Sequence, residues 1–162
     1  MNDRLVATTI RRARPADGEA VRRIVFGTFE EYDIIPEPEG TDKDVMTFGE
    51  HGDPVDEFVA DVDGEAVGSV IVSPHGDGAG WLSKFFVDSR FRGRGIGRAL
   101  LAHAVAAARE RGYRRLELDT RSFFKEAIHL YESTGWTLSP DAPALGPCDV
   151  IYFLDLKGRP LP

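Results

Sequence analysis

Three glycines and four arginines gather in residues 90–98, RFRGRGIGR, just before a run with the apolar spacing of a helix. A turn that leads into a helix leaves backbone N–H groups unpaired, and these groups bind anions together with the positive end of the helix dipole. Glycine lets an anion approach the amides closely, and guanidinium groups nearby add charge. The pattern of this glycine loop, residues 90–98, predicts a phosphate site with room for more than one phosphate.

Two well-known phosphate motifs do not fit these glycines. A P-loop needs Gly-Lys-Ser/Thr, but each of the four lysines follows a residue other than glycine. A dinucleotide fingerprint needs Gly-x-Gly-x-x-Gly, and its last glycine would fall on Arg98 or Leu100. The pattern that remains is Arg92-x-x-Gly95-x-Gly97. Composition alone also allows a glycine-rich turn with solvated arginines.

Strands and helices that would position this loop can be placed along the chain. A strand and turn in residues 8–17 precede a helix from Pro15 to about Glu31, and an acidic loop with one short helix follows to residue 54. Later helices are expected from residue 96 to a stop at Gly112, and from a Ser122 cap through Thr134. Strands are expected at residues 57–74, as a hairpin turning at Asp63 and Gly64, and at 81–89, 114–120, 136–140 and 150–157. This order predicts an α/β fold, a mixed sheet with helices on both faces.

Length and composition restrict the class of protein further. A chain of 162 residues is expected to fold as one domain, residues 1–162. There is no apolar run long enough for a membrane span, and the N-terminus lacks the features of a signal peptide. We therefore expect a cytoplasmic protein with no membrane partner. A single cysteine, Cys148, and four scattered histidines indicate no metal site.

Charge is divided unevenly along the chain. Residues 30–65, the acidic segment, contain fourteen acids and one base, whereas the remainder has nineteen bases and thirteen acids. Such a division allows one region to attract cations and another to attract anions, although an acidic loop can also serve solubility alone. Nucleic-acid binding is not indicated, since four arginines on one loop do not make an extended basic face.

Two motifs in a fixed order carry a family resemblance. The segment WLSKFFVDSRFRGRGIGRALL is followed by LELDT and by AIHLYESTGW. Together they resemble the GNAT superfamily of acyl-CoA-dependent N-acyltransferases, whose pyrophosphate signature is Arg/Gln-x-x-Gly-x-Gly/Ala. The later Leu-Tyr-x-x-x-Gly-aromatic motif of that family matches Leu130, Tyr131, Gly135 and Trp136. The resemblance extends from about residue 9 to residue 157. It implies a mostly antiparallel sheet of six to seven strands with a splayed central parallel pair.

The resemblance also implies acetyl-CoA as co-substrate and places it in the sequence. The coenzyme would lie between strands 81–89 and 114–120, beside a β-bulge near Phe85, Phe86 and Val87. A bulge leaves a ladder amide that can stabilise an oxyanion. The residues expected to bind the cofactor are Phe85, Phe86, Val87, Arg92, Gly93, Arg94, Gly95, Ile96, Gly97 and Arg98.

In such an enzyme a neutral amine attacks the thioester directly, so one proton must leave the acceptor and another must reach the departing thiolate. The resemblance makes Tyr131 the general acid. The base stays open, with Asp119, Glu31 and Asp33 as candidates. Phe124 stands where many members carry an asparagine that contacts the cofactor.

A second departure lies on the strand before the bulge, where some members place a histidine or an acid facing the acceptor. Trp81 and Ser83 occupy these positions. The implied function is acetyl transfer to a primary amine, small molecule or peptide, and the acidic segment favours a cationic one. A non-catalytic acyl-CoA-binding module and an unrelated nucleotide-binding protein are the alternatives. A homodimer is expected only from the resemblance.

Overall fold

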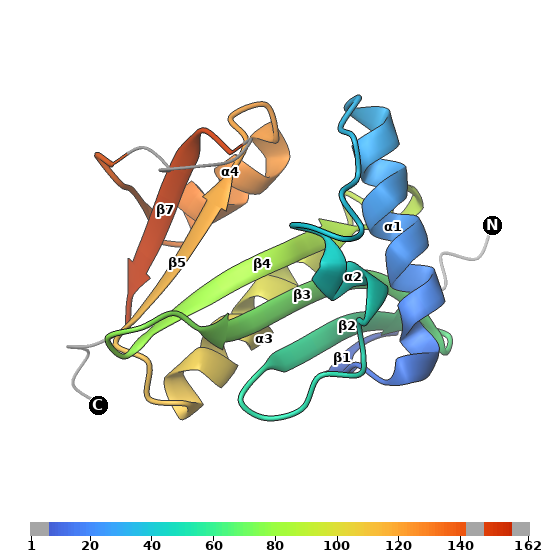
Figure 1. The fold of residues 1–162 in the computed structure, drawn as a ribbon, viewed down its shortest axis with the longest axis horizontal. Coiled ribbons are helices and arrows are strands. Elements are labelled where there is room, and N and C mark those ends of the chain that lie inside the picture. The colour runs from blue at the N-terminus through green and yellow to red at the C-terminus, as the bar shows by residue number, and fades with distance from the viewer. Residues whose placement is uncertain (1–6, 142–147, 157–162) are drawn as a thin grey trace. The chain divides into compact units, whose positions relative to one another are not determined.

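The computed structural model describes residues 7–141 and 148–156. Seven strands, four α-helices and two 3₁₀ turns lie in these ranges (Figure 1). In chain order they are β1 (Thr8–Arg12), a 3₁₀ turn (Pro15–Asp17), α1 (Gly18–Glu31), α2 (Lys43–Met46), β2 (Asp56–Val62), β3 (Glu65–Pro74), β4 (Ala79–Val87), a 3₁₀ turn (Ser89–Phe91), α3 (Ile96–Glu110), β5 (Arg115–Thr120), α4 (Lys125–Ser133), β6 (Thr137–Leu138) and β7 (Val150–Asp155).

The strands form one mixed sheet in the order β1-β2-β3-β4-β5-β7-β6. β1 pairs antiparallel with β2, and β7 pairs antiparallel with both β5 and β6. β4 and β5 run parallel, with a register from Ala79 opposite Arg115 to Trp81 opposite Glu117. The predicted α/β class, with a mostly antiparallel sheet and a central parallel pair, is confirmed.

Most of the expected turns and helix ends are present. Asp63 and Gly64 have φ of 53° and 87°, as a two-residue hairpin turn requires, and Gly64 N donates to Asp61 Oδ1 at 2.7 Å. The Ser122 cap is wrong, because α4 begins at Lys125. Ser122 instead donates its hydroxyl and its amide to Asp149, at 2.6 and 2.7 Å.

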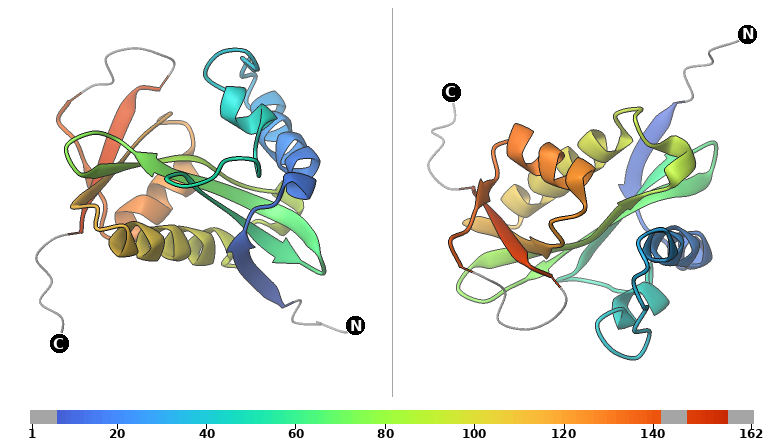
Figure 2. Two further views of the ribbon diagram at one scale, coloured as in Figure 1. Left: turned by 60° about the horizontal axis from the view of Figure 1, so that its bottom comes forward. Right: turned by 90° about the horizontal axis from the view of Figure 1, so that it is seen from above.

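The chain forms two compact units, Met1–Ile71 with Lys84–Ala104, and Val72–Ser83 with Val105–Pro162. In the first unit, α1 and α2 lie on one face of the strands and the start of α3 lies on the other (Figure 2). Ala60, Val62, Val67 and Ile96 form a buried cluster against which Ile10, Val87 and Phe91 pack. The beginning of α3 is therefore anchored in a hydrophobic core.

The second unit is built around β5 and β7. Leu116 and Leu118 of β5 are buried, and the intervening Glu117 is half-buried, so β5 has one apolar and one polar face. The Tyr131 ring of α4 lies 5.9 Å from that of Tyr152 in β7 and 5.6 Å from that of Trp136. These aromatic contacts attach α4 to the strands.

Candidate active site

The glycine loop has the backbone that an anion site needs. Gly93 and Gly95 adopt φ of 77° and 79°, in the left-handed region where a side chain would be strained. Both are exposed, while Ile96 is buried and starts α3. Because a helix leaves its first N–H groups without intrahelical acceptors, the loop presents amides in front of a fixed helix end.

The arginines of the loop divide into two kinds. Arg90 is bound to Asp88 at 2.8 Å, and the guanidinium groups of Arg90 and Arg94 lie 5.7 and 5.3 Å from the centre of the Phe91 ring. The hydrogen bond from Arg90, acting against partial burial, lowers the pKa of Asp88. Arg94 is exposed at the tip of the loop. These two arginines can add charge around a bound anion.

Arg92 has a different set of partners. Its guanidinium donates to both Glu31 carboxylate oxygens at 2.9 and 3.1 Å, to Thr28 Oγ1 at 3.3 Å, and to the Val87 carbonyl at 3.2 Å. It joins the end of β4 to α1 and lines a cavity of about 440 Å³ beside that helix. The position that the resemblance assigns to cofactor binding is thus occupied by an arginine that fixes the loop to α1.

The β-strand before the loop is interrupted at Lys84. This residue has φ of 48° inside β4, a conformation typical of a β-bulge and costly for a residue with a side chain. Ser69 Oγ of β3 donates to the Lys84 carbonyl at 2.7 Å, and Asp88 N donates to the Val67 carbonyl at 2.8 Å. The interruption begins one residue before the expected Phe85.

The Lys84 side chain reaches into the acidic segment. Its Nζ donates to the Thr41 carbonyl at 3.1 Å and lies 3.5 Å from Asp42 and 3.2 Å from Asp44. The Lys84 and Asp42 side chains are 14% and 8% exposed, so this pair is largely desolvated. The contacts connect the bulge of β4 directly to the loop before α2.

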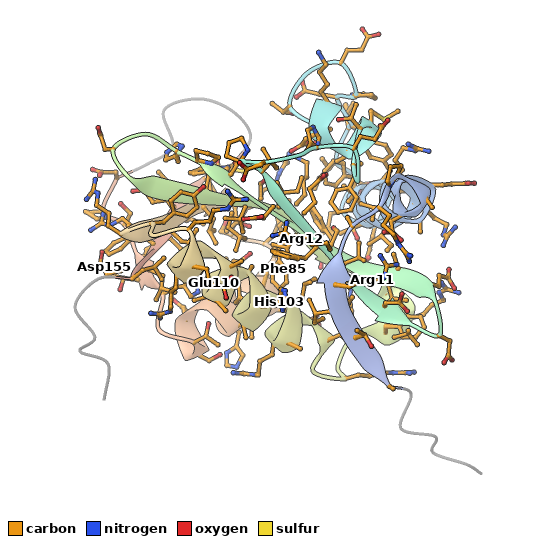
Figure 3. The ribbon with its side chains drawn as sticks, turned by 90° about the horizontal axis from the view of Figure 1, so that it is seen from below. Arg11, Arg12, Phe85, His103, Glu110 and Asp155 are labelled. Atoms are coloured by element: carbon orange, nitrogen blue, oxygen red, sulfur yellow. The ribbon has the colours of Figure 1, made fainter. Side chains whose placement is uncertain are left out.

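Many of the acids in this segment are used internally. Glu57 is 4% exposed and accepts hydrogen bonds from the amides of Gly49 and His51 and from His51 Nδ1, at 2.9 to 3.0 Å. Other partnered acids of the segment include Asp56 with Arg12, Asp61 with Arg11, and Glu65 with Arg23. Figure 3 labels Arg11 and Arg12, and shows them from below. The exposed acids Asp33, Glu37 and Glu39 lie between α1 and α2.

Tyr131, the expected acid, is a buried residue of the second unit. Its side chain is 4% exposed in the aromatic group with Trp136 and Tyr152. Burial raises the pKa of its phenol well above the ordinary value. The hydroxyl is therefore protonated at neutral pH and is available as a donor of a proton or a hydrogen bond.

The candidate bases occupy different environments. Asp119 lies on the polar face of β5 and accepts a hydrogen bond from Cys148, whose pKa rises to about 11 through burial and this carboxylate. Glu31 forms an ion pair with Arg92. Asp33 lies just after α1 and has a positive φ of 56°. Glu31 and Asp33 belong to the first compact unit and Asp119 belongs to the second.

Sequence reasoning missed a group on the polar face of the second unit. His75 follows β3, and its Nε2 lies 3.4 Å from Glu117 Oε2 of β5. The His75 and Trp81 rings lie 4.6 Å apart at 34°. Alternation in LELDT places Glu117 and Asp119 on one face, but only the strand register sets Trp81 opposite Glu117, and only the tertiary structure brings His75 to Glu117.

Comparisons with known proteins agree with this architecture. The model of the acetyltransferase (GNAT) family matches residues 19–136. The uncharacterized N-acetyltransferase YjgM of Escherichia coli is 29% identical over 136 residues, covering 78% of this chain and 80% of that protein. The streptothricin acetyltransferase of Streptomyces lavendulae is 28% identical over 154 residues, covering 78% and 79%.

Solved structures share the fold. A GNAT acetyltransferase from Staphylococcus aureus superposes with a TM-score of 0.83 at 19% identity, covering 93% of this chain and 100% of that one. YncA from Salmonella typhimurium, solved with its cofactor acetyl-CoA, superposes with a TM-score of 0.77 at 22% identity, covering 96% and 98%. At these identities the likeness concerns the fold alone.

Within residues 7–141 and 148–156, no three histidine, cysteine or acidic side chains gather as a metal site would need. In the same ranges, no helix has both the length and the apolar character to span a membrane.

Proposed function

Because the chain belongs to the GNAT acetyltransferase family, we propose that it transfers the acetyl group of acetyl-CoA to a primary amine. The observation that carries this proposal is the left-handed backbone at Gly93 and Gly95 in front of a buried helix start. That backbone suits a pyrophosphate group, because its amides can approach the oxygens without interference from side chains.

The residues present fit coenzyme A, which supplies the activated thioester when it is bound. The backbone of residues 93–98 would hold the pyrophosphate, with Arg94 as an exposed counter-charge. Arg92 would contribute by fixing the loop to α1 through Glu31 and Thr28. Phe85, Phe86 and Val87, just after the bulge at Lys84, would offer backbone groups to the pantetheine arm and the thioester carbonyl.

Tyr131 is proposed as the group that protonates the departing thiolate. Its raised pKa keeps the phenol in the donor state at every pH where the protein is expected to work. Burial among Trp136 and Tyr152 fixes the ring in one orientation. We expect Tyr131→Phe to bind acetyl-CoA normally and to slow thiol release at least tenfold, about 1.4 kcal/mol in the barrier. Unchanged turnover would remove Tyr131 from this role.

The proposed acceptor is a cationic amine, since the exposed acids Asp33, Glu37 and Glu39 remain after the inner acids have been paired. Their field can raise the encounter rate with positively charged molecules. The streptothricin acetyltransferase among the relatives is named for a small-molecule acceptor of its own. That similarity supports a small-molecule acceptor in the proposal for this chain.

A thiol-release assay with acetyl-CoA tests class and acceptor together. Spermidine, an aminoglycoside and a lysine tripeptide should react faster than amines that are uncharged at the assay pH, and the advantage should shrink as salt is added. Binding of acetyl-CoA without thiol release for any amine would instead indicate a non-catalytic acyl-CoA-binding module. Equal rates for charged and uncharged amines would contradict the cationic acceptor alone.

A further inference from the structure

His75, Trp81 and Glu117 form a polar group that no role described above uses. The imidazole Nε2 lies 3.4 Å from Glu117 Oε2, and the ring packs on Trp81 at 4.6 Å. His75 is held at the hairpin by a 2.9 Å hydrogen bond from its amide to the Ala79 carbonyl. Its side chain is 47% exposed and that of Glu117 is 28% exposed, so both remain accessible to a substrate.

The strand register gives this group its significance. Trp81 and Glu117 are directly paired where β4 and β5 run parallel. Hydrogen-bonded strands lie about 4.8 Å apart and leave no room for a third chain between them. If the coenzyme arm follows β4 from the proposed backbone contacts at Phe85, Phe86 and Val87, it must end before this closed register. The reacting end of the arm then lies toward Trp81 and Glu117.

We infer that His75, oriented by Glu117, is the general base that accepts a proton from the acceptor amine. This inference rests on the proposed acetyltransferase function. An imidazole suits the task because histidine changes its charge between pH 5 and 8. The His75 Nε2 faces Glu117 of β5, while Arg115 lies 3.9 Å behind Glu117 and is itself bound to Asp155 at 3.0 Å. A carboxylate beside the ring stabilises the imidazolium that proton transfer creates.

The step balances without any further reactant. One N–H bond of the acceptor ammonium breaks, and its proton forms a bond to the neutral His75 imidazole. The freed amine attacks the thioester carbonyl, and the C–S bond breaks with its electron pair on sulfur. The thiolate takes a proton from the Tyr131 hydroxyl, which regains one from solvent. A second N–H proton leaves the new amide nitrogen to solvent, and His75 returns its proton to water before the next turnover.

Glu117 acts through His75 as a positioning residue. Without its carboxylate the imidazole loses the group that orients it, so Glu117→Gln should lower kcat while the KM for acetyl-CoA stays unchanged. The conservative Glu117→Asp should recover part of the rate, whereas a residue with only a structural role would change kcat and KM together. Glu110→Gln serves as the control for loss of a carboxylate, because Glu110 is exposed at the end of α3 and has no place in the proposed site.

The test measures kcat/KM for acetyl-CoA and spermidine from pH 5.5 to 10, with acetyl-CoA affinity by calorimetry. At pH 7 we expect His75→Gln to lose about 100- to 10,000-fold in kcat/KM, with acetyl-CoA affinity unchanged and the loss shrinking toward pH 10. Glu110→Gln should stay within about threefold of wild type. Recovery of His75→Ala by added imidazole would support the inference, and if His75→Gln folds poorly this rescue decides the question.

The inference can be overturned in two distinguishable ways. If the wild type transfers acetyl groups and His75→Gln does so at the same rate across the pH range, only the base is wrong. Failure of imidazole to restore His75→Ala leads to the same conclusion. If the wild type binds acetyl-CoA and transfers nothing to spermidine, the aminoglycoside or the lysine tripeptide, the proposed function and the inference are both wrong.

Discussion

The glycine loop and the acidic segment both concentrate charge, but they use it differently. In the loop the essential feature is backbone: Gly93 and Gly95 are exposed and left-handed, while Arg92 is turned inward to Glu31. In the acidic segment the inner carboxylates hold the chain in place. Glu57, for example, accepts three hydrogen bonds from Gly49 and His51. In each region buried charges position the chain, and exposed groups remain for a ligand.

This difference shows why net charge is a poor measure of the field that a substrate meets. The segment carries fourteen acids, yet Asp42, Asp56 and Glu57 are buried against partners and attract nothing from solvent. Desolvated carboxylates are stable only with such partners. A cationic acceptor would respond mainly to the exposed carboxylates between α1 and α2.

The largest expected effect concerns a buried acid. Glu57→Gln should lower the free energy of unfolding by about 3 kcal/mol, because an amide NH₂ would face the Gly49 and His51 donors. Denaturant unfolding at pH 7 measures this loss. The exposed Glu39→Gln is the matched control and should change stability by less than about 0.5 kcal/mol. Equal losses for the two variants would erase the distinction between inner and outer acids.

The next effect concerns the backbone of the glycine loop. Gly95→Val should weaken acetyl-CoA binding about 100-fold, because φ of 79° disfavours a side chain and the Cβ atom would stand at the proposed anion site. Calorimetry measures the dissociation constant. Gly27→Ala is the control, since Gly27 lies within α1 with open space around it, and this change should stabilise the helix. Unchanged affinity in Gly95→Val would place the cofactor elsewhere.

A smaller effect is expected at Lys84, which connects β4 to the acidic segment. Lys84→Met loses the contacts with Asp42 and Asp44 and should cost about 2 kcal/mol in the free energy of unfolding. Lys84→Gly loses the same contacts but tolerates φ of 48°, so it should be about 1 kcal/mol more stable than Lys84→Met. Thermal unfolding compares the two. The reverse order would mean that the bulge carries no strain.

The smallest effect concerns the exposed acids. Replacing Glu37 and Glu39 together by glutamine should raise KM for spermidine about two- to fivefold at low salt, with no change in kcat. The KM for acetyl-CoA should stay constant, because these residues belong to the acidic segment and not to the glycine loop. A salt titration of both KM values measures the effect. Loss of acetyl-CoA binding in this variant would contradict the separation of the two regions.

The order of elements, the Asp63–Gly64 hairpin and the glycine stops at Gly112 and Gly135 were predictable from sequence, since they depend on local conformational preferences. Family membership was also predictable, because two spaced motifs carry it. The Ser122 cap was wrong, as Asp149, far along the chain, binds that serine instead. The single domain, the cofactor residues, Tyr131 and Asp119 stay predictions.

The sequence by itself determined the fold class, the family and the position of the glycine loop. These follow from residue type and short spacing, which local sterics and hydrogen bonding translate directly into structure. Only the tertiary structure decided that Arg92 binds Glu31, that Lys84 neutralises Asp42, and that His75 and Trp81 meet Glu117. Those contacts join residues that are distant in sequence. Many other pairs of the same residue types exist in the chain, and strand register and packing decide which of them meet.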